Sequence, residues 1–381
     1  MKKLLRLYLS LICAASLHIY TQDTIEIRHL QPPNLEMSHF GKQILCHRPM
    51  RYGTPKLAVE TIGNKIVADN YGHGGSGWTL APGCARYIVD QCKKAATTST
   101  LDTPITVIGA GALGLFVAYE LVTQGYTHIT IIAERYDNLV SHNAGGFLAP
   151  STMEVTPETQ HLVDSICFDA YRFYADIAHG NNNDFPAQAA LIMPIYLKRP
   201  DDRLQAYENI VMQKPHDVII DFDNGKQYEM KVYDDGIFMD TGILMESLTS
   251  FLQNKVTWVQ QRVTSFDEIN TPIIFNCSGL GARHLNDDKD VVSVQGHLIL
   301  LEDQNPEDMN YMISFYVEPG KTESGQYAKR SIYMFPKHMP DSDARDIGVM
   351  GGTFIEGADN QTPNQEEFDL IIKRSKEFFG T

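Results

Sequence analysis

The most regular hydrophobic pattern in the chain runs from residue 105 to residue 135. ITVI at 105–108 is a short apolar run that predicts a buried strand, and the turn GAGALG follows it directly. A helical pattern then continues to about Gln124, where Gly125 ends it, and HITIIAE at 128–134 predicts a second strand. This order of strand, helix and strand is typical of a dinucleotide-binding unit.

Hydrophobic periodicity predicts further elements on both sides of this unit. Helices are expected at 84–94, 157–180, 241–254 and 363–378, and strands at 272–276, 293–302, 331–335 and 347–355. Because prolines interrupt the segment 22–60, we expect turns and short extended pieces there, and 95–104 is expected to be a linker. Strands that alternate with helices, followed by a strand-rich middle, predict an α/β protein. In it, a doubly wound, Rossmann-like domain carries a mixed-sheet α+β domain.

The turn after the first strand carries a dinucleotide fingerprint. Gly109, Gly111 and Gly114 give the spacing G-x-G-x-x-G. Gly109 permits a tight turn, Gly111 lets the backbone approach a pyrophosphate, and Gly114 allows the helix to pack closely on the strand. The helix N-terminus presents free N–H groups to the phosphates. Glu134, at the end of the second strand, is placed to accept hydrogen bonds from ribose hydroxyls.

The fingerprint alone does not distinguish FAD from NAD, so the other glycine-rich segments matter. Residues 70–83, NYGHGGSGWTLAPG, contain five glycines in fourteen positions, and Ala144, Gly145 and Gly146 lie in the polar loop SHNAGGFLAP. Small residues allow backbone N–H groups to approach an extended ligand closely. Two such loops beside the fingerprint favour a long, flat cofactor, and FAD is therefore the predicted cofactor.

Length and charge exclude some classes of function. The 381 residues are enough for two domains. The formal net charge of −15 makes nucleic acid an unsuitable partner, because binding it requires a surface that neutralises phosphates. No stretch after the N-terminal segment is apolar enough for a transmembrane helix. A small molecule remains the expected substrate.

The N-terminal segment resembles a secretory signal. Three basic residues precede an apolar run from Leu7 to about Leu17, and the small residues 14–16 offer a cleavage point. A buried or amphipathic N-terminal helix is the alternative. With a cleaved signal at 1–22 the protein is expected in the periplasm or outside the cell, and without one it is expected in the cytoplasm.

The six cysteines show neither a CxxC pair nor a clustered Cys/His ligand set, so no metal site is predicted. Cleavage of the signal would remove Cys13 and leave an odd number, which argues against a full disulfide framework. Most of the cysteines are expected to be small core residues.

Several segments together resemble the D-amino-acid oxidase family of FAD-dependent oxidoreductases. They are VIGAGALG (107–114), AER (133–135), AGGFLAP (144–150), IIFNCSGLGA (273–282), VQGHLILL (294–301), GVMGGTF (348–354), HRPMR (47–51) and NYGHGGSGWT (70–79). The last two are the most specific. The resemblance covers most of residues 40–360 and is loose over 155–240.

The order of these segments differs from the usual order in the family. HRPMR and NYGHGG stand ahead of the fingerprint here, whereas the family places them near its C-terminus, after the GGTF-like strand. The resemblance therefore implies a circular permutation in which residues 40–94 come first and 95–104 bridge the gap. The FAD-binding domain is expected to comprise 40–155, 265–292 and 345–381, and the substrate domain 156–264 and 293–344.

The resemblance also implies roles for single residues. Arg48 matches the arginine that pairs with the substrate α-carboxylate, which a guanidinium fork binds through two charge-assisted hydrogen bonds; Arg51 is the competing candidate. Gly75 is expected to offer its carbonyl to the substrate amine, and His73 to be structural. The residues expected to bind FAD are Gly74, Gly75, Ser76, Gly77, Trp78, Thr79, Gly109, Ala110, Gly111, Leu113, Gly114, Glu134, Arg135, Ser141, Gly145, Gly146, Ser278 and Gly279.

One expected residue is missing. The family's active-site tyrosine should stand just before IFMDTG, but Asp234, Asp235 and Gly236 occupy those positions. Tyr233 is the catalytic candidate in its place, with Tyr228 as the alternative.

The implied reaction is FAD-dependent oxidative deamination of a small amino acid, most readily a D-amino acid, to a 2-oxo acid, ammonia and hydrogen peroxide, with O2 as acceptor. Two alternatives stay open. One is an amine or imino-acid dehydrogenase linked to a quinone or another acceptor. The other is a flavin-binding protein without turnover, which the missing tyrosine and the reordered chain favour.

Overall fold

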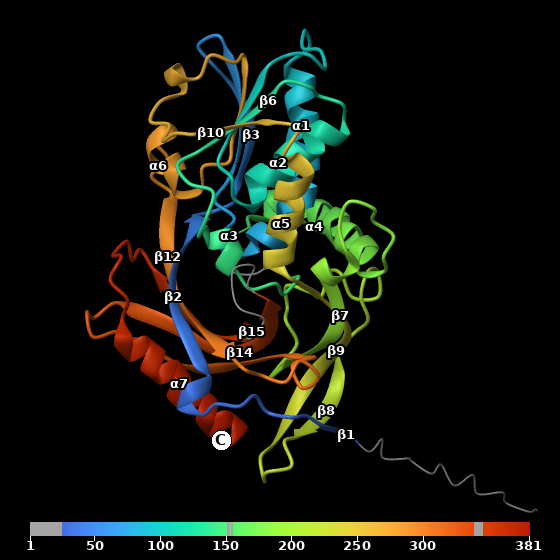
Figure 1. The fold of residues 1–381 in the computed structure, drawn as a ribbon, viewed down its shortest axis with the longest axis vertical. Helices are drawn as coiled ribbons and strands as arrows, with labels where there is room; N and C mark the ends of the chain where they lie inside the picture. The colour runs from blue at the N-terminus through green and yellow to red at the C-terminus, as the bar shows by residue number, and fades with distance from the viewer. Residues whose placement is uncertain (1–24, 151–152, 154, 339–345) are drawn as a thin grey trace, which may run out of the picture.

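The protein is built on two β-sheets that lie one above the other (Figure 1). The computed structural model describes residues 25–150, 153, 155–338 and 346–381. The predicted signal at 1–22 lies outside these residues. In the part of the chain described, no helix combines the length and hydrophobicity needed to cross a membrane.

The smaller sheet has the order β10-β6-β5-β11-β4-β3. Five strands are parallel, and β3 pairs antiparallel with β4 at one edge. Its strands are β3 (Lys56–Ile62), β4 (Lys65–Tyr71), β5 (Ile105–Ile108), β6 (Ile129–Ala133), β10 (Thr257–Gln260) and β11 (Ile273–Asn276). The central strands are apolar runs because both faces of a parallel sheet are covered.

Helices cover one face of the smaller sheet. The helices α1 (Gly77–Ala95) and α2 (Ala112–Thr123) pack against each other and against its strands, and α5 (Thr241–Leu252) packs on α2. Ile105, Val107 and Phe275 point to this face, whereas Ile108 and Ile274 contribute to a separate core on the other face. This alternation follows from the two-residue period of a strand.

The larger sheet has nine strands in the order β1-β8-β9-β7-β13-β14-β15-β12-β2. They are β1 (Glu26–His29), β2 (Phe40–Arg51), β7 (Ala190–Leu197), β8 (His216–Asp221), β9 (Gln227–Met239), β12 (Val291–Glu302), β13 (Met312–Lys321), β14 (Tyr327–His338) and β15 (Asp346–Glu356). The helix α7 (Gln365–Phe379) packs across β12, β14 and β15 and buries Phe368 and Phe379 against this face. The helix α4 (Pro157–Ala178) packs on α1, β7 and β9.

The two sheets share one large hydrophobic core. It includes Ile105 and Val107 of the smaller sheet together with Ile195 and Leu298 of the larger one. Short helical turns complete the chain: η1 (Met37–His39), η2 (Gly74–Ser76), α3 (Val140–Asn143), η3 (Ala187–Ala189), η4 (Phe266–Glu268), η5 (Gly279–Gly281) and α6 (Ala282–Leu285). The two parts are therefore packed together rather than joined by a linker.

Most predicted elements occur where the hydrophobic pattern placed them, including the four helices and the strands after residue 270. The expectation of short pieces at 22–60 was wrong, because β2 is a twelve-residue strand. Pro49 is tolerated inside it, since β2 is the edge strand of its sheet and one side of it has no partner strand.

The predicted domain boundaries also differ from the observed sheet membership. The strands β2 and β15 were placed with the FAD-binding segments but belong to the nine-stranded sheet, and α7 packs on that sheet. Conversely, β10 was placed in the substrate domain but pairs with β6 in the smaller sheet. Pairing between strands far apart in the sequence decides these memberships, and local pattern carries no information about it.

Candidate active site

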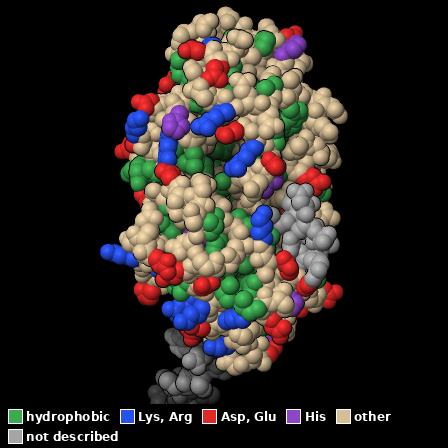
Figure 2. All heavy atoms as spheres, turned by 60° about the vertical axis from the view of Figure 1, so that its left-hand side comes forward, with side chains coloured by type: hydrophobic (Ala, Val, Ile, Leu, Met, Phe, Trp, Pro, Cys, Tyr) green, Lys and Arg blue, Asp and Glu red, His purple; other side chains and the backbone are tan. Residues whose placement is uncertain are grey.

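A cleft of about 860 Å3 lies where the carboxyl ends of the parallel strands meet the larger sheet. This is the position at which open α/β sheets bind ligands, and the volume is within the usual range of about 300–1,000 Å3 for ligand sites. In Figure 2 the side with α6 and β12 faces forward, and a hollow bordered by basic side chains opens at mid-height.

The fingerprint glycines are packed as the sequence predicted. Gly109 has φ of 105°, and a Cβ there would lie 2.4 Å from the Cys277 carbonyl oxygen. A Cβ on Gly114 would lie 2.0 Å from the carbonyl oxygen of Gly109, so the helix approaches the strand closely only because this residue is glycine. Gly111 directly precedes α2, and the space around its Cβ position is free apart from Ser141.

Most of the predicted cofactor residues line this cleft. Those that do are Gly74, Gly75, Gly77, Trp78, Gly109, Ala110, Gly111, Leu113, Glu134, Arg135, Ser141, Gly145, Ser278 and Gly279. Ser76, Thr79, Gly114 and Gly146 are not among the lining residues. Thr79 Oγ1 donates a 2.9 Å hydrogen bond to the Ala149 carbonyl, and a Cβ on Gly146 would meet the Met239 backbone. These residues support the cleft wall from behind.

Ser141 ties the two glycine-rich surfaces together. Its hydroxyl accepts a 3.0 Å hydrogen bond from the Ala112 N–H at the start of α2. Its carbonyl accepts a 3.0 Å hydrogen bond from the indole Nε1 of Trp78, at the start of α1. The fingerprint loop and the 74–79 loop are therefore held at a fixed separation.

The loop at 144–146 is held by a residue that the sequence did not indicate. Lys337, only 1% exposed, donates hydrogen bonds from Nζ to the carbonyls of His142 (2.6 Å) and Ala144 (2.7 Å) and to Thr241 Oγ1 (2.8 Å). Burial lowers the pKa of Lys337 to about 7. Gly145 faces the Phe335 ring at 3.3 Å from its Cβ position, so the loop packs tightly on β14.

The charge of the cleft is opposite to that of the chain. Among the described residues that line it, four are arginines, Arg48, Arg135, Arg262 and Arg283, and one is a carboxylate, Glu134. Arg262 was not predicted, because it lies in a loop with no motif. A cleft lined with positive charge attracts anions even in an acidic protein.

Arg48 stands on β2 at the wall of the cleft and donates a 3.1 Å hydrogen bond from Nη1 to the Thr353 carbonyl. A Cβ on Gly296 of the neighbouring strand would lie 2.6 Å from both terminal nitrogens of Arg48. The guanidinium therefore lies across β12, in space that a larger residue would fill. Burial opposes its charge, but Cys46 and Tyr333 together raise the pKa of Arg48. Arg48 thus stays cationic.

Tyr333 on β14 is the tyrosine that lines the cleft beside Arg48. Burial raises the pKa of Tyr333 to about 12, against the opposing effect of Arg48, so its hydroxyl stays protonated at neutral pH. Gly351 and Gly352 leave room for this ring, since a Cβ on either would lie within 2.5 Å of the Tyr333 hydroxyl oxygen.

The structure does not place Tyr233, the predicted catalytic tyrosine, in the cleft lining. Tyr233 is fully buried outside the cleft lining, where its hydroxyl accepts a 3.3 Å bond from the Asp201 N–H and donates to Glu208 at 3.4 Å. The alternative, Tyr228, stacks on Phe378 and donates to that residue's carbonyl. Tyr333 lies in the predicted strand 331–335, but strand alternation alone does not show which of its faces meets a cofactor.

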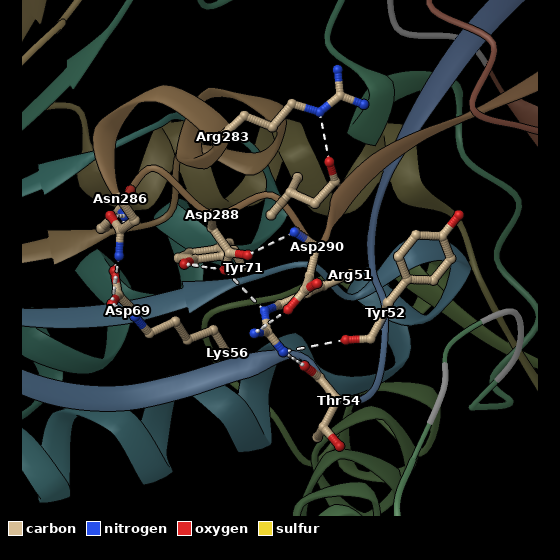
Figure 3. Close-up of polar contacts among 12 residues, drawn as sticks. Arg51, Tyr52, Thr54, Lys56, Asp69, Tyr71, Arg283, Asn286, Asp288 and Asp290 are labelled. Atoms are coloured by element: carbon tan, nitrogen blue, oxygen red, sulfur yellow. Dashed lines mark hydrogen bonds and ion pairs between the residues drawn. The ribbon is translucent and has the colours of Figure 1, made fainter.

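The two candidate arginines, Arg48 and Arg51, have different surroundings. Arg51 Nε pairs with Asp288 at 2.9 Å and Nη2 with Asp290 at 3.1 Å, whereas Arg48 has no carboxylate partner among the described residues. Figure 3 shows Arg51 turned toward these carboxylates and the carbonyls of Tyr52 and Thr54. Of these two residues, Arg48 is therefore the one available to a ligand carboxylate.

The fit of FAD can be judged from the protein alone. Glycines leave space for a pyrophosphate at the start of α2, Glu134 lies at the end of β6, and a second glycine loop faces the same cleft. A helix N-terminus beside a glycine turn is a ready site for phosphates. These residues fit FAD along the length of the cleft.

Comparisons with known proteins agree with this geometry. The family model described as FAD dependent oxidoreductase (DAO) matches residues 104–381. The chain is 22% identical to a D-amino-acid oxidase of Streptomyces coelicolor over 72% of this chain and 77% of that protein. It is 25% identical to a D-amino acid oxidase of Dugesia ryukyuensis over 71% and 76%.

Among solved structures, glycine oxidase from Bacillus cereus aligns with a TM-score of 0.49 at 12% identity, covering 72% of this chain and 79% of that one. L-proline dehydrogenase from P. horikoshii gives a TM-score of 0.49 at 11% identity, covering 73% and 77%. The family match spans well over half of the chain and begins at the strand before the fingerprint. The protein belongs to the family of FAD-dependent oxidoreductases, and FAD is its cofactor.

Proposed function

We propose that the protein oxidises the amine-bearing carbon of a small amino acid, with D-amino acids as the preferred substrates. The observation that carries the proposal is the pair Arg48 and Tyr333 at the wall of a cleft whose other end holds the dinucleotide fingerprint. A cation and a protonated hydroxyl side by side suit a carboxylate.

Arg48 would hold the substrate α-carboxylate, and Tyr333 would donate a further hydrogen bond to it. Both side chains come from the same nine-stranded sheet, Arg48 from β2 and Tyr333 from β14, so their separation is set by a rigid element. Holding the substrate in one orientation beside the reacting group can lower the barrier by about 7–11 kcal/mol. Positioning is therefore the main contribution of these residues.

Gly75 is the residue whose carbonyl we assign to the substrate amine, because it lies in the loop that lines the opposite wall. A substrate bound with a neutral amine needs no protein base. His73 does not serve as one, since burial lowers its pKa to about 3 and its imidazole accepts no proton at neutral pH.

When bound, FAD supplies the redox chemistry by accepting the α-hydrogen with two electrons. The substrate becomes an imine, which water converts to a 2-oxo acid and ammonia. Dioxygen takes up two electrons and two protons and leaves as hydrogen peroxide. Two relatives named D-amino-acid oxidase support this choice of substrate class.

The proposal is tested by mixing the FAD-loaded protein anaerobically with D- and L-amino acids, glycine and sarcosine while following the flavin absorbance. We expect bleaching by small D-amino acids, and peroxide on admission of air. Bleaching without peroxide, together with reduction of a quinone or dye, would favour the acceptor-linked dehydrogenase. A flavin that no amino acid bleaches would contradict turnover altogether.

We also propose that the segment 40–94 occupies the place that the family gives to its C-terminal segment. The family match starts at residue 104, and β4 lies beside β11 in the middle of the smaller sheet. The C-terminus and β1 lie at the same lower end of the molecule (Figure 1). A chain that starts at residue 104 and carries 25–95 after residue 381 through a flexible linker should still fold and bind FAD; loss of FAD binding would contradict the permutation.

A further inference from the structure

A second cavity, of about 260 Å3, shares His73 of the glycine-rich loop with the cleft. Its walls come from α1, α4 and the turn that joins β2 to β3. The residues that form its apolar wall are Leu57, Leu80, Cys84, Leu162, Val163 and Ile166. The proposed function gives this cavity no role.

The charges at its mouth are already paired. Arg51 pairs with Asp288 and Asp290, and Lys56 pairs with Asp69 at 3.2 Å and with Glu60 at 3.0 Å. Figure 3 shows Arg51 beside Asp288 and Asp290, and Lys56 beside Asp69. An anion would have to break these pairs to bind, so the cavity suits a small uncharged molecule.

His73 lines both this cavity and the cleft. It is 1% exposed, its Nε2 lies 3.3 Å from Cys84 Sγ, and its Nδ1 has no hydrogen-bond partner. Burial lowers the pKa of His73 to about 3, so the ring is neutral. The neutral side chain of His73 therefore separates the second cavity from the cleft.

We propose that this cavity is the route by which dioxygen reaches the cofactor cleft, with His73 as the partition between the two spaces. The inference rests on the proposed oxidase function. Apolar cavities take up small apolar molecules, and one wall of this cavity is apolar. The linings of the two spaces share His73, so the second cavity meets the cleft at the glycine-rich loop.

The first test separates the oxygen reaction from the amino-acid reaction. The holoenzyme is reduced with dithionite and mixed with buffer at several oxygen concentrations, and the second-order rate constant for flavin reoxidation is measured. Leu162→Phe adds a ring to a half-buried residue of the cavity wall. Because the surrounding interior is close-packed, the ring must occupy part of the cavity, and the rate constant for reoxidation should fall about fivefold. The rate of anaerobic reduction by substrate should not change.

Ile243→Phe is the matched control, since Ile243 is a half-buried aliphatic residue on a helix and lines neither space. It should leave both rates unchanged. Equal reoxidation in wild type and Leu162→Phe would overturn the oxygen route while leaving the oxidase function intact. Slow reoxidation of the wild type itself would overturn both, which distinguishes the two failures.

A second measurement does not depend on any variant. Crystals of the wild-type holoenzyme under xenon pressure should show a xenon atom between Leu80, Leu162 and Ile166, because xenon occupies apolar cavities open to small solutes. A cavity that holds ordered water instead, or no xenon, would overturn the proposal.

Discussion

The two ends of the cleft are built to bind in different ways. At the smaller sheet, the proposed FAD-binding end offers backbone groups and lacks side chains at Gly109, Gly111 and Gly75. At the larger sheet, the proposed substrate end offers two long side chains, Arg48 and Tyr333, which lie on strands nearly 300 positions apart. A local motif can make the first kind of site, whereas only a correctly assembled sheet can make the second.

The largest effect should come from closing the backbone end. Gly111→Val places a branched side chain where the backbone must approach the pyrophosphate, and we expect the purified protein to lose its bound flavin. Absorbance near 450 nm and a titration with FAD measure the loss. The fold should persist by circular dichroism, since the Cβ position has only Ser141 nearby. Retention of FAD would show that the fingerprint loop does not contact the cofactor.

A substitution at the side-chain end of the cleft should impair catalysis and leave FAD binding intact. Arg48→Ala should leave FAD bound but lower kcat/KM for D-amino acids by about 30- to 4,000-fold, because removing one partner of a buried charged pair costs about 2–5 kcal/mol. Arg48→Lys keeps the charge and loses the fork, so it should recover only part of the activity. Unchanged kinetics in Arg48→Ala would place the carboxylate elsewhere.

Tyr333→Phe should have a smaller effect, because it removes one neutral donor. A lost hydrogen bond of about 1 kcal/mol corresponds to a roughly fivefold rise in KM. Tyr233→Phe is the matched control and should leave KM unchanged, since that hydroxyl contacts Asp201 and Glu208. The reverse result would restore Tyr233 to the site.

The smallest effect concerns the pH dependence of stability. Each end holds one buried neutral histidine, His73 beside the glycine loop and His297 behind Arg48. Burial lowers the pKa of His297 to about 4, although Glu367 opposes the shift. Between about pH 6.5 and 4 the unfolded chain, with its ordinary histidine pKa of about 6.5, binds a proton at this position and the folded chain does not. The free energy of unfolding therefore falls as pH falls through this range.

His297→Asn should remove this contribution. Urea unfolding of the holoenzyme between pH 6 and 4.5 should then depend on pH less steeply by about 1.4 kcal/mol per pH unit. The measurement compares slopes, so an overall loss of stability in the variant does not affect it. Identical slopes would mean that His297 is protonated in the folded protein.

The hydrophobic pattern and the glycine-rich motifs were sufficient to predict the local elements and the cofactor. The βαβ unit at 105–135, the helices after residue 150 and the glycine-rich loops are determined by neighbours in sequence, because periodicity and turn chemistry act within a few residues. For the same reason, most of the predicted cofactor residues line the cleft.

Sheet membership and the substrate-side residues were decided only by tertiary structure. The strand β2 joins the larger sheet by pairing with β12, roughly 250 residues later in the chain, and β15 joins it by pairing with β12 and β14. Local pattern does not encode these pairings. That pairing brings Arg48, Thr353 and Tyr333 together, whereas Tyr233, chosen by its place in the sequence, is buried elsewhere. The sequence by itself thus determined a dinucleotide fold and its cofactor, and the assembled sheets decided which side chains line the proposed substrate end of the cleft. The physical reason is that backbone recognition is local, while a side-chain site needs strands that are distant in sequence to lie adjacent in space.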